Sequence, residues 1–157
     1  MDGDYAETVR ARGHENVRGE HGSTFEVTSD DWLTPAGDCI LAVEADRTPA
    51  DFGEAFVAAC KRRDATITAR LEVEPGTREG NGMAEGGEPL VETVVGRGDP
   101  ALTFGSDRSL VGRTSDYVDD RTVLVEADRA AVDFDRELVA ALAAGASATL
   151  TLSVERE

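Results

Sequence analysis

Lysine is almost absent from this 157-residue sequence, since Lys61 is the only lysine among 16 basic residues and the others are arginine. The 32 acidic residues give a formal net charge of −16. A small domain with this charge repels itself in dilute buffer, and concentrated salt screens the repulsion because the Debye length falls to about 3 Å at 1 M. Because the acids are spread along the whole chain, we favour adaptation to a salt-rich cytosol over an acidic mimic of nucleic acid.

Salt is therefore expected to stabilise the protein. The midpoint of thermal unfolding should be higher in molar KCl than in dilute buffer, because screening weakens the repulsion among surface carboxylates. Circular dichroism melts in the two solutions measure this difference. An equal or higher midpoint in dilute buffer would contradict the interpretation of the charge.

Cysteine is scarce as well, with only Cys39 and Cys60 in the chain. Two thiols cannot form a disulfide framework and no Cys-x-x-Cys pair suggests zinc, so we expect reduced, buried thiols and no disulfide-linked partner. No run approaches the roughly 18 consecutive apolar residues of a membrane helix. Residues 1–5 contain two aspartates and no basic residue, whereas a signal peptide begins with a basic segment. We therefore expect a cytoplasmic protein with no membrane partner.

Two parts of the chain repeat each other in order, which predicts that residues 7–74 and 92–155 are copies of one unit. The clearest match is Val43-Glu44-Ala45-Asp46-Arg47, which returns as Val125-Glu126-Ala127-Asp128-Arg129. Three shorter matches are Glu7–Val9 with Glu92–Val94, Thr28–Asp30 with Thr114–Asp116, and Asp51–Phe52 with Asp133–Phe134. Between the copies, residues 75–89 are rich in Gly, Glu and Pro, which predicts a flexible acidic linker.

Each copy is predicted to contain three strands, a helix and a final strand. Alternating or continuous apolar residues predict strands at 6–12, 24–28, 39–43 and 66–74 in the first copy, and near 92–98, 110–111, 122–125 and 148–154 in the second. Helical spacing predicts helices at 49–63 and 132–144, with Thr48 as an N-cap and Gly145 as a C-cap. We expect a strand-rich α+β fold in one domain over residues 1–157, whose two pseudo-symmetric β-β-β-α-β halves close into a barrel.

Asp46 and Asp128 occupy the same place in the repeated segment. Each follows a predicted strand and precedes a predicted helix, where a carboxylate stabilises the helix N-terminus, so we expect a structural role. A ligand on the pseudo-dyad would also use equivalent residues twice, and that alternative stays open.

Two stretches of the sequence are similar to a known family. They are Arg12–Val17 followed by Leu33–Ile40, and Ser115–Thr122 leading into Ala127–Asp128. Together they resemble the archaeal domain of unknown function numbered 371 over nearly the whole chain apart from the linker. The resemblance implies an archaeal source and brings no established activity, ligand or catalytic residue. The long acidic linker departs from the family's usual pattern.

Two Arg-Gly steps stand at matching positions of the repeat, in Arg12-Gly13-His14 and Arg97-Gly98-Asp99. Glycine permits close approach of a backbone, and arginine can donate two parallel hydrogen bonds to a carboxylate or phosphate. If the pseudo-dyad brings both steps to one concave surface, they would bind a small anionic ligand, a nucleotide or RNA. The alternative is a pair of tight turns whose arginines pair with neighbouring acids.

An enzyme is the second class of function that the sequence permits. Only the first copy carries His14, His21, Asp38 and Cys39, a set that could bind a metal, or in which a histidine could activate the thiol as a nucleophile. Their spacing matches no zinc motif, and histidines in glycine-bounded turns are more often exposed hydrogen-bonding groups. The sequence identifies no cofactor. The position of His14 relative to Cys39 discriminates between the two classes.

Overall fold

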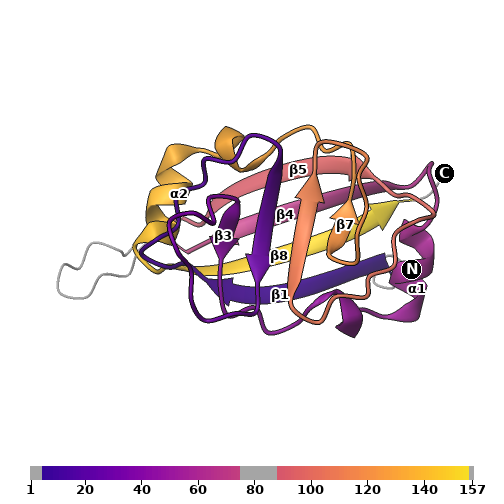
Figure 1. Cartoon of the computed structure of the whole chain (residues 1–157), viewed down its shortest axis with the longest axis horizontal. Coiled ribbons are helices and arrows are strands. Elements are labelled where there is room, and N and C mark those ends of the chain that lie inside the picture. The colour runs from indigo at the N-terminus through magenta and orange to yellow at the C-terminus, as the bar shows by residue number, and fades with distance from the viewer. Residues whose placement is uncertain (1–4, 75–87, 156–157) are drawn as a thin grey trace.

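The computed structural model describes residues 5–74 and 88–155, in which two four-stranded β-sheets face each other (Figure 1). The strands are β1 (Ala6–Arg12), β2 (Thr24–Thr28), β3 (Ile40–Ala42), β4 (Thr66–Val73), β5 (Leu90–Arg97), β6 (Ser109–Arg113), β7 (Thr122–Leu124) and β8 (Ser147–Glu155). Sheet A has the order β1-β8-β4-β5 and is antiparallel throughout. Sheet B has the order β3-β2-β6-β7, and each of its short outer strands runs parallel to its neighbour. The expected strand-rich α+β fold is confirmed.

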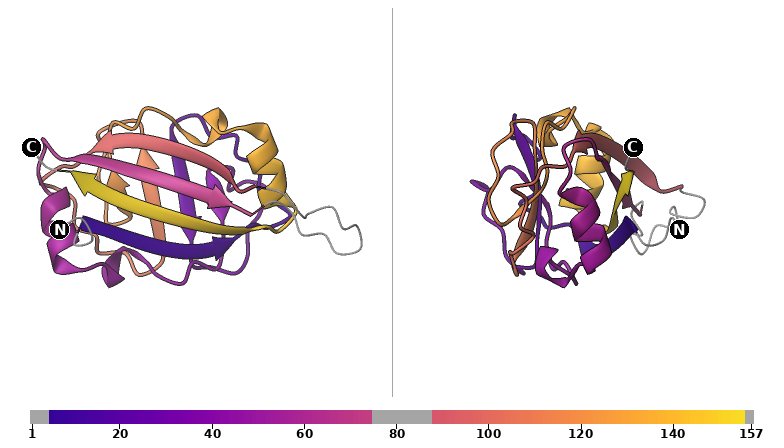
Figure 2. Two further views of the ribbon diagram at one scale, coloured as in Figure 1. Left: turned by 180° about the vertical axis from the view of Figure 1, so that it is seen from behind. Right: turned by 90° about the vertical axis from the view of Figure 1, so that its right-hand side faces the viewer.

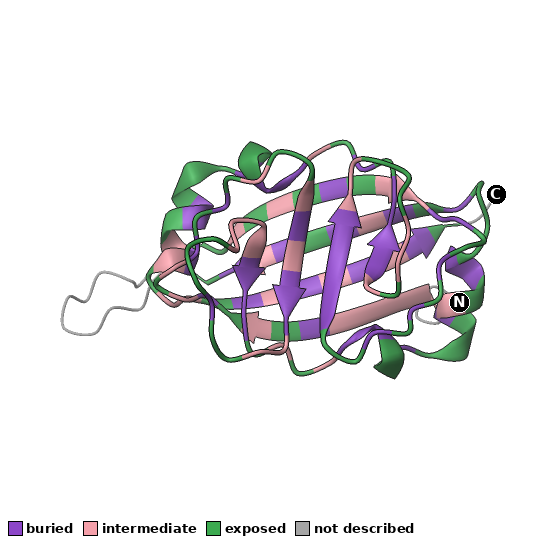
Figure 3. Cartoon of the chain, in the orientation of Figure 1, coloured by how far each residue is buried: buried purple, intermediate pink, exposed green. Residues whose placement is uncertain are grey.

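The core lies between the two sheets, because alternate residues of the long strands turn inward (Figure 3). In β4 and β8 every second residue is buried, as the alternation in the sequence predicts. The inward residues of these two strands are Ile67, Ala69, Leu71, Val73, Ala148, Leu150, Leu152 and Val154. The outer face of sheet A carries mostly polar side chains, with Val91 and Val95 exposed among them.

The helices α1 (Glu54–Cys60) and α2 (Arg136–Ala143) lie at opposite ends of the sandwich, and each carries the chain from sheet B to sheet A (Figure 2). They are shorter than the predicted ranges 49–63 and 132–144. Short 3-10 turns, η2 (Pro49–Asp51) and η3 (Ala131–Asp133), precede them. Phe52 and Phe134 separate turn from helix because both adopt extended backbone, with ψ of 152° and 149°. Both rings are buried, so core packing overrides the helical periodicity.

The expected barrel closure is wrong. Strands β3 and β7 are only three residues long, and single bridges, Arg12 with Val43 and Arg97 with Val125, connect the two sheets at their edges. The next residues, Glu44 and Glu126, have φ of 60° and 51°. This left-handed conformation interrupts the extended backbone after each bridge, so neither bridge extends into a ladder.

The repeated segments Val43–Arg47 and Val125–Arg129 cover the free edges of sheet A. The Asp46 carboxylate accepts a hydrogen bond from the Arg10 backbone at 2.9 Å, and the Asp128 carboxylate accepts one from Val95 at 3.0 Å. These carboxylates therefore cap edge strands, not the helices that the sequence suggested. Satisfying an edge in this way also blocks pairing with a strand of another chain.

One of the shorter sequence matches is shifted by a residue in the structure. The Ala45 N–H donates to the Thr28 carbonyl at 3.0 Å, and the Ala127 N–H donates to the Arg113 carbonyl at 2.9 Å. Thr28 therefore corresponds to Arg113, not to Thr114. The predicted linker lies outside the described residues except for Glu88 and Pro89.

Candidate functional site

Arg12 ends strand β1 at one corner of sheet A. Its guanidinium donates to the Glu44 carboxylate at 2.9 Å, and half of the arginine side chain is exposed. This hydrogen bond lowers the pKa of Glu44. The neighbouring His14 accepts a hydrogen bond on Nδ1 from the Asn16 N–H at 3.0 Å. Arg12 is thus paired with one carboxylate and is accessible from solvent.

Arg97 ends strand β5 and is more fully neutralised. It donates to the Gly98 carbonyl at 2.8 Å, to Asp99 at 3.2 Å and to Glu126 at 3.1 Å, and only 25% of its side chain is exposed. Asp99 stands where the first copy has His14 and accepts from Arg97 itself. The corner at Arg97 therefore has less capacity for an added anion than the corner at Arg12.

The glycines of the two Arg-Gly steps are required by packing against the helix ends. The Gly13 N–H donates to the Ala146 carbonyl at 2.8 Å, and a Cβ added at Gly13 would lie 1.8 Å from the Leu142 carbonyl oxygen of α2. A Cβ added at Gly98 would lie 2.1 Å from the Cys60 carbonyl oxygen of α1. Backbone oxygens cannot move aside as a flexible side chain can.

The structure does not bring the two steps together into one pocket. Arg12 pairs with Ser147 at the start of β8, whereas Arg97 pairs with Thr66, which is opposite Glu155 at the end of β8. The two arginines therefore lie on opposite edges and at opposite ends of sheet A. Their registers also place both on the outer face of that sheet, which the sequence did not reveal.

His21 and Asp38 lie near Cys39, and their hydrogen bonds serve the local turns. The His21 N–H donates to the Asp38 carbonyl at 3.3 Å, and the His21 ring nitrogen Nδ1 lies 3.1 Å from the Thr24 hydroxyl. The Cys39 thiol donates to Glu26 at 3.2 Å. Cys39 is only partly buried, so the expected burial of both thiols is wrong for it. Its partial burial and the charge of Glu26 raise the pKa of the thiol to about 12. Cys39 is therefore protonated at neutral pH and is a poor nucleophile.

Metal binding finds no support in the side-chain positions. Within residues 5–74 and 88–155, no three His, Cys, Asp or Glu side chains gather closely enough to hold a metal ion. The second thiol, Cys60, is fully buried, and that burial raises its pKa to about 12 as well. For the alternative set of His14, His21, Asp38 and Cys39, the fold therefore supports neither an activated thiol nor a metal site among the described residues.

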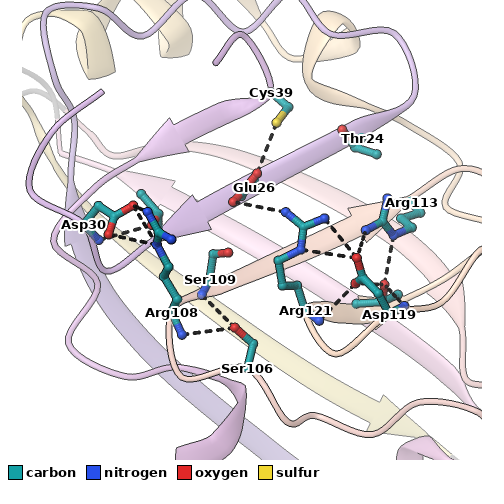
Figure 4. Close-up of polar contacts among 12 residues, drawn as sticks. Thr24, Glu26, Asp30, Cys39, Ser106, Arg108, Ser109, Arg113, Asp119 and Arg121 are labelled. Atoms are coloured by element: carbon teal, nitrogen blue, oxygen red, sulfur yellow. Dashed lines mark hydrogen bonds and ion pairs between the residues drawn. The ribbon is translucent and has the colours of Figure 1, made fainter. Parts of the chain in front are cut away.

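A polar network crosses the outer face of sheet B, and sequence reasoning missed it (Figure 4). Glu26 lies between the Cys39 thiol and Arg121, whose guanidinium is 4.0 Å away. Arg121 and Arg113 both donate to Asp119, at 2.9 and 3.0 Å. Burial alone would raise the pKa of Asp119, but hydrogen bonds from Arg121 and Thr122 and the charge of Arg113 lower it to about 2.

A second ion pair on this face joins segments that are distant in sequence. The Arg108 guanidinium donates to both carboxylate oxygens of Asp30 at 2.9–3.1 Å. The Ser106 hydroxyl accepts from the backbone N–H groups of Arg108 and Ser109. Every arginine of this network has a carboxylate partner. We therefore assign the network to holding the loops onto sheet B.

The comparisons with known proteins agree with the resemblance seen in the sequence. An uncharacterized protein of Methanocaldococcus jannaschii is 34% identical over 138 residues, which cover 87% of this chain and 90% of that protein. In the part of the chain that the structure describes, no helix is both long and apolar enough to cross a membrane. The sequence profile of the family described as Domain of unknown function (DUF371) matches residues 9–155, and the chain belongs to that family.

Proposed function

We propose that this protein is a non-catalytic binding module for a small phosphate-bearing anion, such as a nucleotide. Its site is the Arg12 corner, defined as Arg10, Arg12, Glu44, Asp46 and Ser147. The observation that carries the proposal is the pair of exposed arginines two residues apart on edge strand β1. Residues at this spacing point to the same face of a strand, so both guanidiniums can reach one anion. Among the described residues, Arg10 forms no ion pair.

The shape of the surface supports a site at this corner. A shallow hollow of about 280 Å³ is lined by the five residues of the Arg12 corner together with Ala11. A second hollow, of about 260 Å³, is also lined by Arg12, together with Gly13, His14 and the end of α2. An incoming phosphate would compete with Glu44 for Arg12, and Glu44 is exposed enough to swing into solvent. Short charge-assisted hydrogen bonds persist in salt that screens long-range repulsion.

Removal of both guanidiniums should abolish most of the binding. We expect the Arg10→Ala, Arg12→Ala double variant to bind pyrophosphate or adenosine monophosphate at least about tenfold more weakly than wild type, since one hydrogen bond to a charged group contributes about 1.5–3 kcal/mol. Isothermal titration calorimetry in KCl measures the affinities. The matched control is Arg62→Ala, which removes another half-exposed arginine paired with one carboxylate, Asp64. Failure of wild type to bind, or equal losses in variant and control, would refute the proposal.

We also infer that the single domain arose by duplication of residues 7–74 and 92–155. Equivalent contacts in the two copies support this inference. Arg47 lies over the Phe52 ring and Arg129 over the Phe134 ring, each with 5.4 Å between the guanidinium carbon and the ring centroid. Each of these arginines also bonds a backbone carbonyl of the neighbouring edge strand. We expect the Cα trace of residues 7–74 to superpose on that of residues 92–155, with gaps confined to loops. A superposition of the two traces tests the inference.

A further inference from the structure

The outer face of sheet A is an uncovered surface, and no described helix lies over it (Figure 2, left). We call this face the platform. By strand register, its seventeen residues are Ala6, Thr8, Arg10, Arg12, Thr66, Thr68, Arg70, Glu72, Val91, Thr93, Val95, Arg97, Ser147, Thr149, Thr151, Ser153 and Glu155. None of them is buried. Eight of them carry hydroxyl groups.

The charge of the platform is opposite to that of the whole protein. The chain has 32 acidic and 16 basic residues. The platform has four arginines, and its only carboxylates are Glu72 and Glu155. Four more carboxylates border its two edges: Glu44 and Glu126 pair with Arg12 and Arg97, and Asp46 and Asp128 bond the backbone of the edge strands. Arginines thus outnumber carboxylates on the strands themselves, and most acids of this face lie along its rim. Because clefts and faces with one sign of charge attract ligands of the other, this distribution favours an anionic partner.

The four arginines form a diagonal across the platform. Along β8, Arg12 is level with Ser147, Arg10 with Thr149, and Arg70 with Thr151. Arg97 follows at the level of Glu155, through Thr66. The line therefore passes from edge strand β1 over β4 to edge strand β5. Given about 3.4 Å per residue and about 4.8 Å between strands, it spans roughly 30 Å.

We infer that the platform binds single-stranded RNA along this diagonal, with its phosphates on Arg12, Arg10 and Arg70 and a weaker contact at Arg97, which Asp99 and Glu126 already neutralise. The inference rests on the proposed function, because the Arg12 corner is one end of the line. A surface of this length without a deep pocket suits an extended polymer better than a small molecule. The arginine at its centre, Arg70, is half exposed and pairs with a single carboxylate, Glu72, at 2.9 Å.

The spacing of the platform also suits a nucleic-acid backbone. Consecutive phosphates of a nucleotide strand are separated by as many backbone bonds as consecutive same-face residues of a β-strand. Inorganic polyphosphate packs its charges far more densely. Between the arginines, hydroxyls such as those of Thr149, Thr151 and Ser153 can exchange hydrogen bonds with phosphate oxygens and with the ribose 2′-OH. The 2′-OH distinguishes RNA from DNA at such a surface.

No aromatic residue occurs on the platform, so it offers no ring on which a base can stack. Stacking and base-edge hydrogen bonds supply most sequence preference in single-strand binding. The RNA should therefore bind through its backbone, with little preference for base sequence. Oligomers of uridine and of mixed sequence are expected to bind with similar affinity.

Fluorescence anisotropy tests the inference with labelled oligouridylates of increasing length in KCl at about 0.5 M, where the Debye length is well below 8 Å. We expect affinity to rise until the RNA spans the diagonal, and DNA of the same length to bind more weakly. Arg70→Ala and Thr151→Glu, both near the centre of the platform, should weaken RNA binding about tenfold. The controls are Arg62→Ala and Thr34→Glu, which alter exposed residues outside the platform.

Pyrophosphate binding separates failure of this inference from failure of the proposed function. Arg70→Ala should still bind pyrophosphate as wild type does, because Arg70 lies outside the Arg12 corner. A wild-type protein that binds pyrophosphate but no RNA would overturn the platform inference alone. Binding of neither ligand would overturn both. DNA binding equal to RNA binding, or tighter binding of polyphosphate, would overturn the assignment to RNA.

Discussion

Substitution of Gly13 or Gly98 by alanine should lower the free energy of unfolding by about 3 kcal/mol, which is at the upper end of the usual cost of overpacking. The new methyl group would lie 1.8 Å from the Leu142 carbonyl oxygen in one case and 2.1 Å from the Cys60 carbonyl oxygen in the other. Because each oxygen belongs to a helix backbone, relief requires the helix end to move. For a chain of this length the midpoint of thermal unfolding should fall by roughly 10 °C.

Thermal and urea unfolding of the two variants measure the effect, with Gly22→Ala as the control. A Cβ at Gly22 meets no atom within 4 Å, so this substitution changes glycine to alanine without a clash. Gly13 and Gly98 variants that unfold like the Gly22 variant would show that the helix ends yield easily. In that case packing would not explain the glycines of the Arg-Gly steps, and close approach of a ligand would become the better reason for them.

The long strands could be predicted from the sequence because their residues alternate. Strands β4 and β8 pair along their whole length, so an apolar residue at every second position suffices to place both the strand and its buried face. The barrel was predicted wrongly, because closure depends on the backbone at two residues. Glu44 and Glu126 have positive φ, a conformation that no hydrophobic pattern reports.

The helices show a different limit of sequence reasoning. Phe52 and Phe134 fit a helical stripe, yet each ring enters the core from extended backbone. Tertiary packing decides such a residue, and its partners are distant in sequence. The Phe52 ring, for example, packs with its centroid 6.0 Å from that of Phe104. The same separation concealed the pairing of Asp30 with Arg108 on sheet B.

Arg12 and Arg97 could be singled out from the repeat, but the surface they share could not. That surface depends on the register of β1, β8, β4 and β5, which puts Arg10 and Arg70 on the same face as the two corner arginines. An isolated arginine in an alternating strand gives no sign of its neighbours across the sheet. The sequence therefore identified the ends of the diagonal and missed its middle.

Asp119→Asn should lower the free energy of unfolding by about 2 kcal/mol at neutral pH, because Asp119 has its pKa held at about 2 instead of 3.8. The variant leaves Arg113, whose side chain is 12% exposed, without its carboxylate partner. A lowered pKa means that the folded state favours the charged form. The stabilisation is therefore complete above about pH 5 and is lost as the pH falls through the unfolded value of 3.8 towards 2.

Urea unfolding at a series of pH values tests both parts of this expectation. Wild type should lose stability between about pH 5 and 2, and the Asp119→Asn variant should lack the share of that loss due to Asp119, because an amide does not titrate. Asp116→Asn is the matched control, since Asp116 is exposed in the same loop and makes no hydrogen bond or ion pair within residues 5–74 and 88–155. If both variants lost equally little stability, the two arginines would hold the loop without Asp119. Glu26, which lies 4.0 Å from Arg121, would then be the carboxylate that holds the loop on sheet B.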